Sequence, residues 1–260
     1  MLRPRIIPCL LIKNGGLVKT VNFSSPKYVG DPINAVRIFN EKEVDEILVV
    51  DIDATVLGRE PDYGMIKSLA AECRMPLCYG GGVKSVEEIE RIVSLGVEKV
   101  ALSSVAMEKL ELVKKAARRV GSQSIVGIMD VRKLGGENVY EVYTHNGSKP
   151  TGWRPDVLAK QMEELGAGEV VINSIDRDGV MDGYDMDLVA QVRKATSLPL
   201  TVLGGAGSLK DIEALIRSYG IIGAAAGSLF VFKGVYRAVL INYPKRSEKD
   251  SLITQAMQRA

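Results

Sequence analysis

The segment Met75–Ser85 reads MPLCYGGGVKS, and 123 residues further along the chain Leu198–Ser208 reads LPLTVLGGAGS. The two align without a gap: an apolar run, consecutive glycines and a closing serine follow in the same order. Two further pairs of identical residues have the same spacing, Glu46 with Glu169 and Asp53 with Asp176. Three matches at one spacing indicate an internal repeat. We therefore predict two related halves, about residues 1–122 and 123–260.

Short apolar runs alternate with amphipathic stretches from end to end. The eight runs are Arg5–Ile12, Glu46–Val50, Pro76–Tyr79, Lys99–Leu102, Ser124–Met129, Glu169–Ile172, Pro199–Leu203 and Ile222–Ala226. Helical periodicity is clear in Ser85–Leu95, Glu108–Val120 and Pro155–Leu165. Eight strand–helix alternations predict an α/β fold, a single (β/α)₈ TIM barrel over residues 1–260 that is built from two half-barrels. A doubly wound open sheet is the alternative.

One segment interrupts the alternation. In YEVYTHNGSKP, which begins at Tyr140, apolar residues recur with period two and lead into the turn dipeptide Asn146-Gly147. This pattern predicts a small hairpin inserted after the fifth strand. His145, the only histidine, lies in this hairpin, and we interpret it as a solvent-exposed loop residue.

Composition argues against several classes of protein. A net charge of +2, from 34 basic and 32 acidic residues, does not favour a nucleic-acid binder. No apolar run is long enough to span a bilayer, and the first residues, interrupted by Pro8, read as a strand rather than a signal peptide. The three cysteines lack CxxC spacing. We therefore predict a cytoplasmic protein with no disulfide, no metal and no cofactor.

The glycine pairs of the repeat, Gly81-Gly82 and Gly204-Gly205, would lie on opposite sides of the barrel mouth. Without side chains in the way, their N–H groups can point at phosphate oxygens. The loops after the next strands add further donors, from Ser103, Ser104, Gly227 and Ser228. The alternative is that these glycines only permit tight turns. Two anion sites predict a small-molecule ligand with phosphate at both ends.

Several motifs occur in the order in which one known family has them. They are RIIPCL (Arg5–Leu10), VKTVNF (Val18–Phe23), YGGGVKS (Tyr79–Ser85), GSQSIV (Gly121–Val126), GAGE (Gly166–Glu169) and SIDRDGVMDGYD (Ser174–Asp185). Over residues 1 to about 240 the chain resembles the HisF family, the cyclase subunits of imidazole glycerol phosphate synthase. The resemblance implies a lyase-type barrel with a HisH-like glutaminase docked on its N-terminal face. Ammonia from that partner crosses the barrel to a bis-phosphorylated substrate.

Four charged residues stand at the starts of predicted strands: Arg5, Glu46, Lys99 and Glu169. Burying unpaired charges is very costly, so these four must pair with one another. A structural plug of salt bridges is one interpretation. The resemblance implies another, in which the four form the gate of the ammonia passage.

The catalytic residues match the family only in part. Asp130, at the end of the fifth strand, corresponds to one of its two catalytic aspartates. The other should close the first strand in a Cys-Leu-Asp-Val-Lys pattern, but here residues 9–13 read Cys-Leu-Leu-Ile-Lys, which places Leu11 at that position. Leucine cannot transfer a proton, so this departure argues against an efficient cyclase.

Other positions of the site are retained or altered. Lys19 matches a substrate-binding position of the family, and Asp178 and Gly179 match its phosphate site. Asp53 stands where the family usually has threonine. Since the first two strands are neighbours in this barrel, Asp53 is a candidate catalytic carboxylate that partly replaces the one missing at Leu11. A helix-capping or surface aspartate is the alternative.

We draw three hypotheses about function. Relatives with the altered first strand resemble proteins of bacterial surface-sugar (O-antigen) modification, in which ammonia reaches an amidotransferase or synthetase that converts an N-acetyl into an acetamidino group. The chain would then conduct ammonia. The second hypothesis is an active cyclase of histidine biosynthesis. The third is a non-catalytic phosphate-binding barrel that activates a glutaminase.

Overall fold

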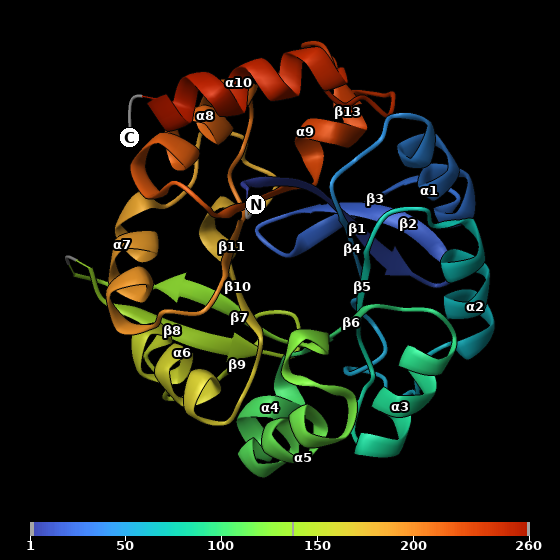
Figure 1. The fold of residues 1–260 in the computed structure, drawn as a ribbon, viewed down its shortest axis with the longest axis vertical. Helices are drawn as coiled ribbons and strands as arrows, with labels where there is room; N and C mark the ends of the chain where they lie inside the picture. The colour runs from blue at the N-terminus through green and yellow to red at the C-terminus, as the bar shows by residue number, and fades with distance from the viewer. Residues whose placement is uncertain (1–2, 137, 259–260) are drawn as a thin grey trace.

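A computed structural model describes residues 3–136 and 138–258, so the predicted domain of residues 1–260 is seen except for 1–2, 137 and 259–260. Eight parallel strands close into a barrel with helices around it (Figure 1). The strands are β1 (Arg5–Lys13), β4 (Ile47–Asp51), β5 (Leu77–Gly80), β6 (Lys99–Leu102), β7 (Ile125–Lys133), β10 (Glu169–Ser174), β11 (Leu200–Leu203) and β12 (Gly223–Ala226). Pairing of β1 with β12 and of β7 with β10 leaves no open edge. The TIM barrel is confirmed, and the doubly wound alternative is wrong.

The helices that follow the strands cover the outside of the barrel. They are α1 (Pro32–Glu41), α2 (Tyr63–Glu72), α3 (Val86–Ser94), α4 (Ser104–Glu108), α5 (Leu110–Val120), α6 (Pro155–Glu164), α7 (Met186–Ala195), α8 (Leu209–Tyr219) and α9 (Ser228–Val231). A capping box starts α3, in the segment Ser85–Leu95 that the sequence predicts as helical: Ser85 Oγ accepts from Glu88 N while the Glu88 carboxylate accepts from Ser85 N. Within residues 3–136 and 138–258, no helix has the length and hydropathy to cross a membrane.

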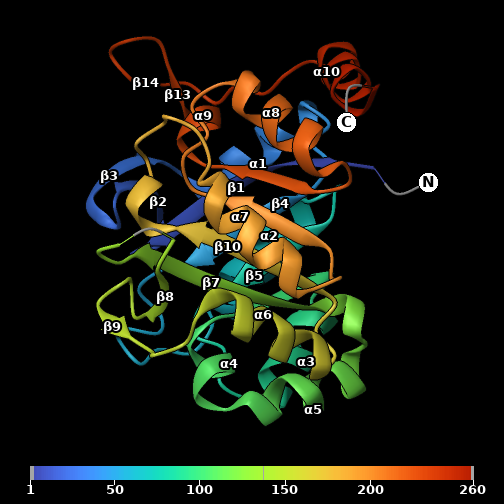
Figure 2. The ribbon, with the colours of Figure 1, turned by 90° about the vertical axis from the view of Figure 1, so that its left-hand side faces the viewer.

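Two antiparallel hairpins project from the C-terminal end of the barrel (Figure 2). The predicted one is confirmed: β8 (Tyr140–Thr144) pairs with the end of β7 and with β9 (Lys149–Pro150). The other, β2 (Gly16–Val21) with β3 (Ser24–Gly30), extends β1 and was not predicted. Part of its signal was present, because Asn14-Gly15, which joins β1 to β2, is a two-residue turn with both φ angles positive.

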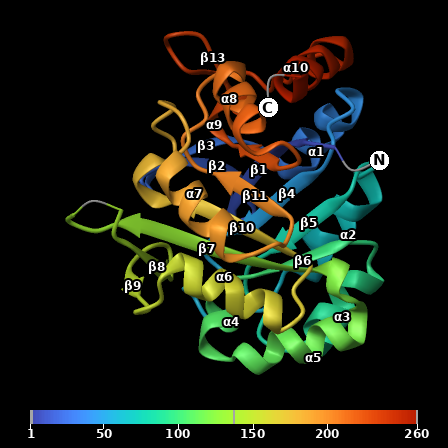
Figure 3. The ribbon, with the colours of Figure 1, turned by 60° about the vertical axis from the view of Figure 1, so that its left-hand side comes forward.

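The C-terminal helix α10 (Arg246–Gln258) lies beside α8, near the N-terminal end of the barrel (Figure 3). Its Lys249 Nζ is 2.7 Å from Asp45 Oδ1, and both side chains are buried. The other Asp45 oxygen accepts a hydrogen bond from Ile6 N in β1. One buried carboxylate thus links the last helix to the first strand.

The inside of the barrel has its own apolar core, separate from the one between strands and helices. Its members are mostly small or medium-sized: Ile7, Cys9, Leu48, Cys78, Ala101, Val126, Ile128, Val171 and Ala225. They are the inward-facing residues of the strands, since side chains alternate along a strand. This core separates the two ends of the barrel, and each end carries polar residues.

Candidate functional site

A cavity of about 390 Å³ opens at the C-terminal end of the barrel. Twelve of the predicted site residues line it: Lys19, Gly81, Gly82, Ser103, Ser104, Asp130, Asp178, Gly179, Gly204, Gly205, Gly227 and Ser228. They come from both halves of the chain. The fold therefore brings the repeated glycine turns and Asp130 to a single site.

The glycine turns have similar backbone geometry in the two halves. Gly81 and Gly82 have φ of +116° and +75°, and Gly204 and Gly205 have +91° and +112°. A Cβ at Gly81 would lie 2.3 Å from Asp51 O. Glycine is thus required here for the turn itself, and the same geometry leaves the turn backbone bare toward the cavity.

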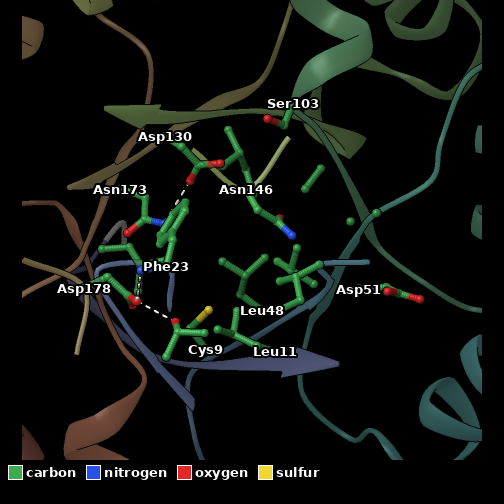
Figure 4. Close-up of a pocket in the computed structure, with 18 of the residues that line it drawn as sticks. Cys9, Leu11, Phe23, Leu48, Asp51, Ser103, Asp130, Asn146, Asn173 and Asp178 are labelled. Carbon is green, nitrogen blue, oxygen red and sulfur yellow. Dashed lines mark hydrogen bonds between the residues drawn. The ribbon is translucent and has the colours of Figure 1, made fainter. Parts of the chain in front are cut away.

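Asp130 projects from β7 into the cavity (Figure 4). Asn173 Nδ2 in β10 donates to its Oδ1 at 2.9 Å. Burial raises the pKa of Asp130 to about 7, and the Asn173 hydrogen bond offsets only part of this effect. Asp130 can therefore hold or release a proton near neutral pH. Sequence reasoning missed Asn173, a polar residue that directly follows the apolar run Glu169–Ile172.

Leu11 lines the cavity from β1, next to Leu48 of β4 (Figure 4). The position opposite Asp130 is thus apolar, as the Leu11 substitution suggested. Asp53 does not fill the gap: it is buried outside the cavity lining, where Lys13 Nζ lies 2.9 Å from its Oδ1. Asp53 thus lies beside Lys13 rather than on the cavity lining, and its catalytic role stays a prediction.

The carboxylate near Leu11 that does line the cavity is Asp51, at the end of β4. Burial raises its pKa, even though its Oδ1 accepts from Asp53 N and Ala54 N at 3.0 and 3.1 Å. These two hydrogen bonds hold Asp51 in a turn. Sequence reasoning passed over Asp51 because the difference from the family lay at Asp53.

Lys19 and Asp178 connect the β2–β3 hairpin to the cavity. Lys19 is 5% exposed, its Nζ donates to Cys9 O at 2.5 Å, and burial lowers its pKa. Asp178 Oδ2 accepts from Thr20 Oγ1 at 2.5 Å and from Phe23 N at 3.3 Å. The Asp178 side chain thus fastens the hairpin, and any donor to a phosphate at this position would come from the backbone.

The β8–β9 hairpin also contributes to the cavity, through His145 and Asn146. His145 is half-buried, with Nδ1 3.0 Å from Thr144 Oγ1, so its assignment as an exposed loop residue is wrong. Sequence periodicity could not show that this turn folds over the mouth. In the part of the chain that the structure describes, no group of three His, Cys, Asp or Glu residues could hold a metal ion.

At the opposite end, the four predicted charges form one ring. Lys99 Nζ lies 2.8 Å from both Glu46 Oε2 and Glu169 Oε2. Arg5 Nη2 lies 2.7 Å from Glu169 Oε1, and Arg5 Nη1 contacts Glu46. The carboxylates are almost fully buried, while the two cations are partly exposed at the floor.

Charge pairing favours the ionised forms of Arg5, Lys99 and Glu169. Burial alone would lower the pKa values of Arg5 and Lys99, but the carboxylates of Glu169 and Glu46 raise both. Burial would likewise raise the pKa of Glu169, yet hydrogen bonds and charge from Arg5 and Lys99 lower it. Above the ring, apolar side chains such as Cys78, Ala101 and Val171 fill the inside of the barrel.

Comparison with known proteins agrees with this geometry. The pattern of the histidine biosynthesis protein family matches residues 5–237. A protein of Leptospira interrogans, provisionally named imidazole glycerol phosphate synthase subunit HisF, is 55% identical over 97% of this chain and 99% of its own length. Similarly named subunits of Vibrio vulnificus and Pseudomonas aeruginosa are 56% and 51% identical over 96% of this chain. The matches cover 96% and 99% of the length of these two relatives. The chain belongs to the histidine biosynthesis protein family and is a HisF-like barrel.

Proposed function

We propose that this barrel conducts ammonia from a HisH-like glutaminase to its phosphorylated-ligand site, in a glutamine amidotransferase system that modifies a bacterial surface sugar. One observation carries the proposal: the charged ring at the floor is complete, while Leu11 faces the cavity where the family's cyclases have an acid. The chain thus retains the four charges of the family's ammonia gate but lacks one of the family's two catalytic aspartates.

The passage suits a small neutral molecule. The bore between ring and cavity is lined by apolar side chains such as Leu48, Ala101 and Val171, which solvate ions poorly. Ammonia is neutral, so it crosses such a bore at far lower cost than ammonium or metal cations. The glutaminase would dock on the face that carries Arg5, Glu46, Lys99 and Glu169.

At the other end, the two glycine turns would bind the phosphates of the ligand. Lys19 adds a buried amine to the same cavity, where its Nζ has hydrogens left over after its bond to Cys9 O. We expect a sulfate or phosphate ion at each turn, Gly81-Gly82 and Gly204-Gly205, in crystals soaked in either salt. An anion bound at both turns, with an affinity that falls when the turn glycines are substituted, would support the assignment of the turns as phosphate sites. Two empty turns at saturating anion would contradict it.

The ammonia acceptor would be a separate amidotransferase or synthetase that converts an N-acetyl group into an acetamidino group. Deletion of this chain should then abolish the acetamidino sugar, and an external ammonium supply should restore it. Loss of histidine prototrophy, with the sugar unchanged, would contradict the proposal.

A second candidate is the histidine cyclase itself, which Asp130 favours because its pKa near 7 suits general acid–base catalysis. Growth complementation of a strain that lacks the cyclase separates the two. Rescue would establish the cyclase, and failure of a well-expressed chain would favour the conduit. A barrel that only activates its glutaminase would fail to rescue growth of that strain and would also fail to supply ammonia to an acceptor protein.

A further inference from the structure

Thr201 of β11 contacts the charged ring but is not one of the four residues that the family resemblance supplies. Its Oγ1 donates to Glu169 Oε1 at 2.6 Å and accepts from Arg5 Nη2 at 3.3 Å. The residue is only 1% exposed. A hydroxyl that donates to a carboxylate and accepts from a guanidinium restricts the motion of both groups, because it is hydrogen-bonded to each of them.

The neighbouring strand is shaped to admit this hydroxyl. Thr201 pairs with Gly223 of β12, and a Cβ at Gly223 would lie 1.9 Å from Thr201 Oγ1. Even alanine at position 223 would therefore displace the hydroxyl from its place at the ring. Gly223 has a negative φ, so this close contact, rather than its backbone conformation, explains the glycine.

The internal repeat provides a comparison within the same molecule. The spacing that relates Glu46 to Glu169 also relates Cys78 to Thr201. Cys78 is buried in the bore, and in the described parts of the chain its thiol makes no hydrogen bond to the ring. Glu169 therefore has a neutral donor as well as two cations, whereas among residues 3–136 and 138–258 the side chain of Glu46 bonds to Arg5 and Lys99 alone.

We propose that Thr201 is a positioning residue of the ring: it fixes Glu169 and Arg5 as the rigid side, so that the ring yields at Glu46. The proposal rests on the ammonia-conduit function for its biological meaning, but its physical content concerns the isolated chain. A fixed Arg5 keeps the floor closed to water while the Glu46 side loosens. The ring then opens on one side instead of falling apart.

The first test follows the Nη–H protons of Arg5 by ¹⁵N NMR in the isolated chain, since these signals sharpen only when the guanidinium is immobile. We expect slow exchange in the wild type and in Thr201→Ser, which keeps the hydroxyl. In Thr201→Val, whose side chain has a similar volume, the Nη–H protons of Arg5 should exchange with water about tenfold faster or more. This is the effect expected when a hydrogen bond to a charged group is lost. Thr144→Val, a buried threonine outside the ring, is the matched control.

Unchanged Arg5 exchange in Thr201→Val would overturn the proposal. Should that variant not fold, Thr201→Cys makes the same test, because it installs the side chain that the other half carries. A second measurement uses the complex with the glutaminase: Thr201→Val should lower glutamine-driven product more than ammonium-driven product. If Glu46→Ala lowers both equally, the conduit fails, while the Arg5 result still decides the role of Thr201.

Discussion

At the residue scale, Asp130 and Leu11 determine which proton-transfer groups the two sides of the cavity provide. Asp130 has an amide partner, Asn173, and a pKa near 7, so one proton is exchangeable at neutral pH. Across the cavity Leu11 contributes only methyl groups. Asp51 is tied to backbone N–H groups, and Asp53 is paired with Lys13. A reaction that needs an acid and a base on opposite sides therefore lacks one of them.

Restoring the carboxylate should restore chemistry. We expect very slow or no turnover of the family's bis-phosphorylated substrate with free ammonia by the wild type, and a faster rate in Leu11→Asp. A general acid or base commonly contributes about 10²–10⁴ in rate. Leu11→Asn controls for polarity, and Asp130→Asn in the Leu11→Asp background should abolish the gain. A wild-type rate like that of ordinary cyclases would instead support the histidine assignment.

The raised pKa of Asp130 also affects stability. Its ordinary value is 3.8 and its folded value is about 7, so the native state binds more protons than the unfolded state between these two values. Stability contributed at this site is therefore highest below pH 4 and falls as pH rises to about 7. Asp130→Asn should raise the free energy of unfolding at pH 8, by roughly 4 kcal/mol at most, and change it little at pH 4. Equal effects at both pH values, in urea titrations, would contradict this assignment.

At the scale of the elements, the sequence predicted each barrel strand to within a few residues, because an apolar run between helical patterns is a strong local signal. The glycine turns were also predicted, because they repeat at a spacing of 123 residues. The charged ring was predicted because its four charges stand at the starts of apolar runs. Thr201 and Asn173 were missed: whether a polar side chain within a strand points into the bore depends on how the barrel closes. The contact of Asp53 with Lys13 was also missed, because the two residues lie 40 positions apart in the chain.

The attachment of α10 gives a test at this scale. Asp45 contacts Lys249 at 2.7 Å and Arg3 at 2.7 Å, and it accepts from Ile6 N. Asp45→Ala leaves the buried Lys249 side chain with Glu43 O but without its carboxylate partner, and loss of such a partner commonly costs about 3–5 kcal/mol. Lys249→Met should cost less, because Asp45 keeps its other donors. Urea titration compares the two, and equal costs would show that Lys249 is not the sensitive member.

At the scale of the whole molecule, an apolar core inside the barrel separates two polar ends. The charged ring lies at the N-terminal end of the barrel strands, and the cavity with its glycine turns lies at their C-terminal end. A cation at the floor lies about a strand length from the cavity, too far to bind a ligand there. The ring therefore serves either the stability of the floor or the passage of a molecule through it.

Replacement of Glu46 distinguishes these two roles. Glu46→Ala leaves Arg5 and Lys99 with Glu169 as their only carboxylate, and loss of a buried partner commonly costs about 3–5 kcal/mol, so the variant should be less stable. Where it remains folded, a conduit requires that glutamine-driven product falls while ammonium-driven product is retained, because only the first uses the passage. Asp45→Ala is the matched control, since it removes a buried carboxylate at the same end of the barrel but outside the ring. Equal loss with both nitrogen donors in Glu46→Ala would mean that the ring is a structural plug, because a plug affects the barrel and not the route of the nitrogen.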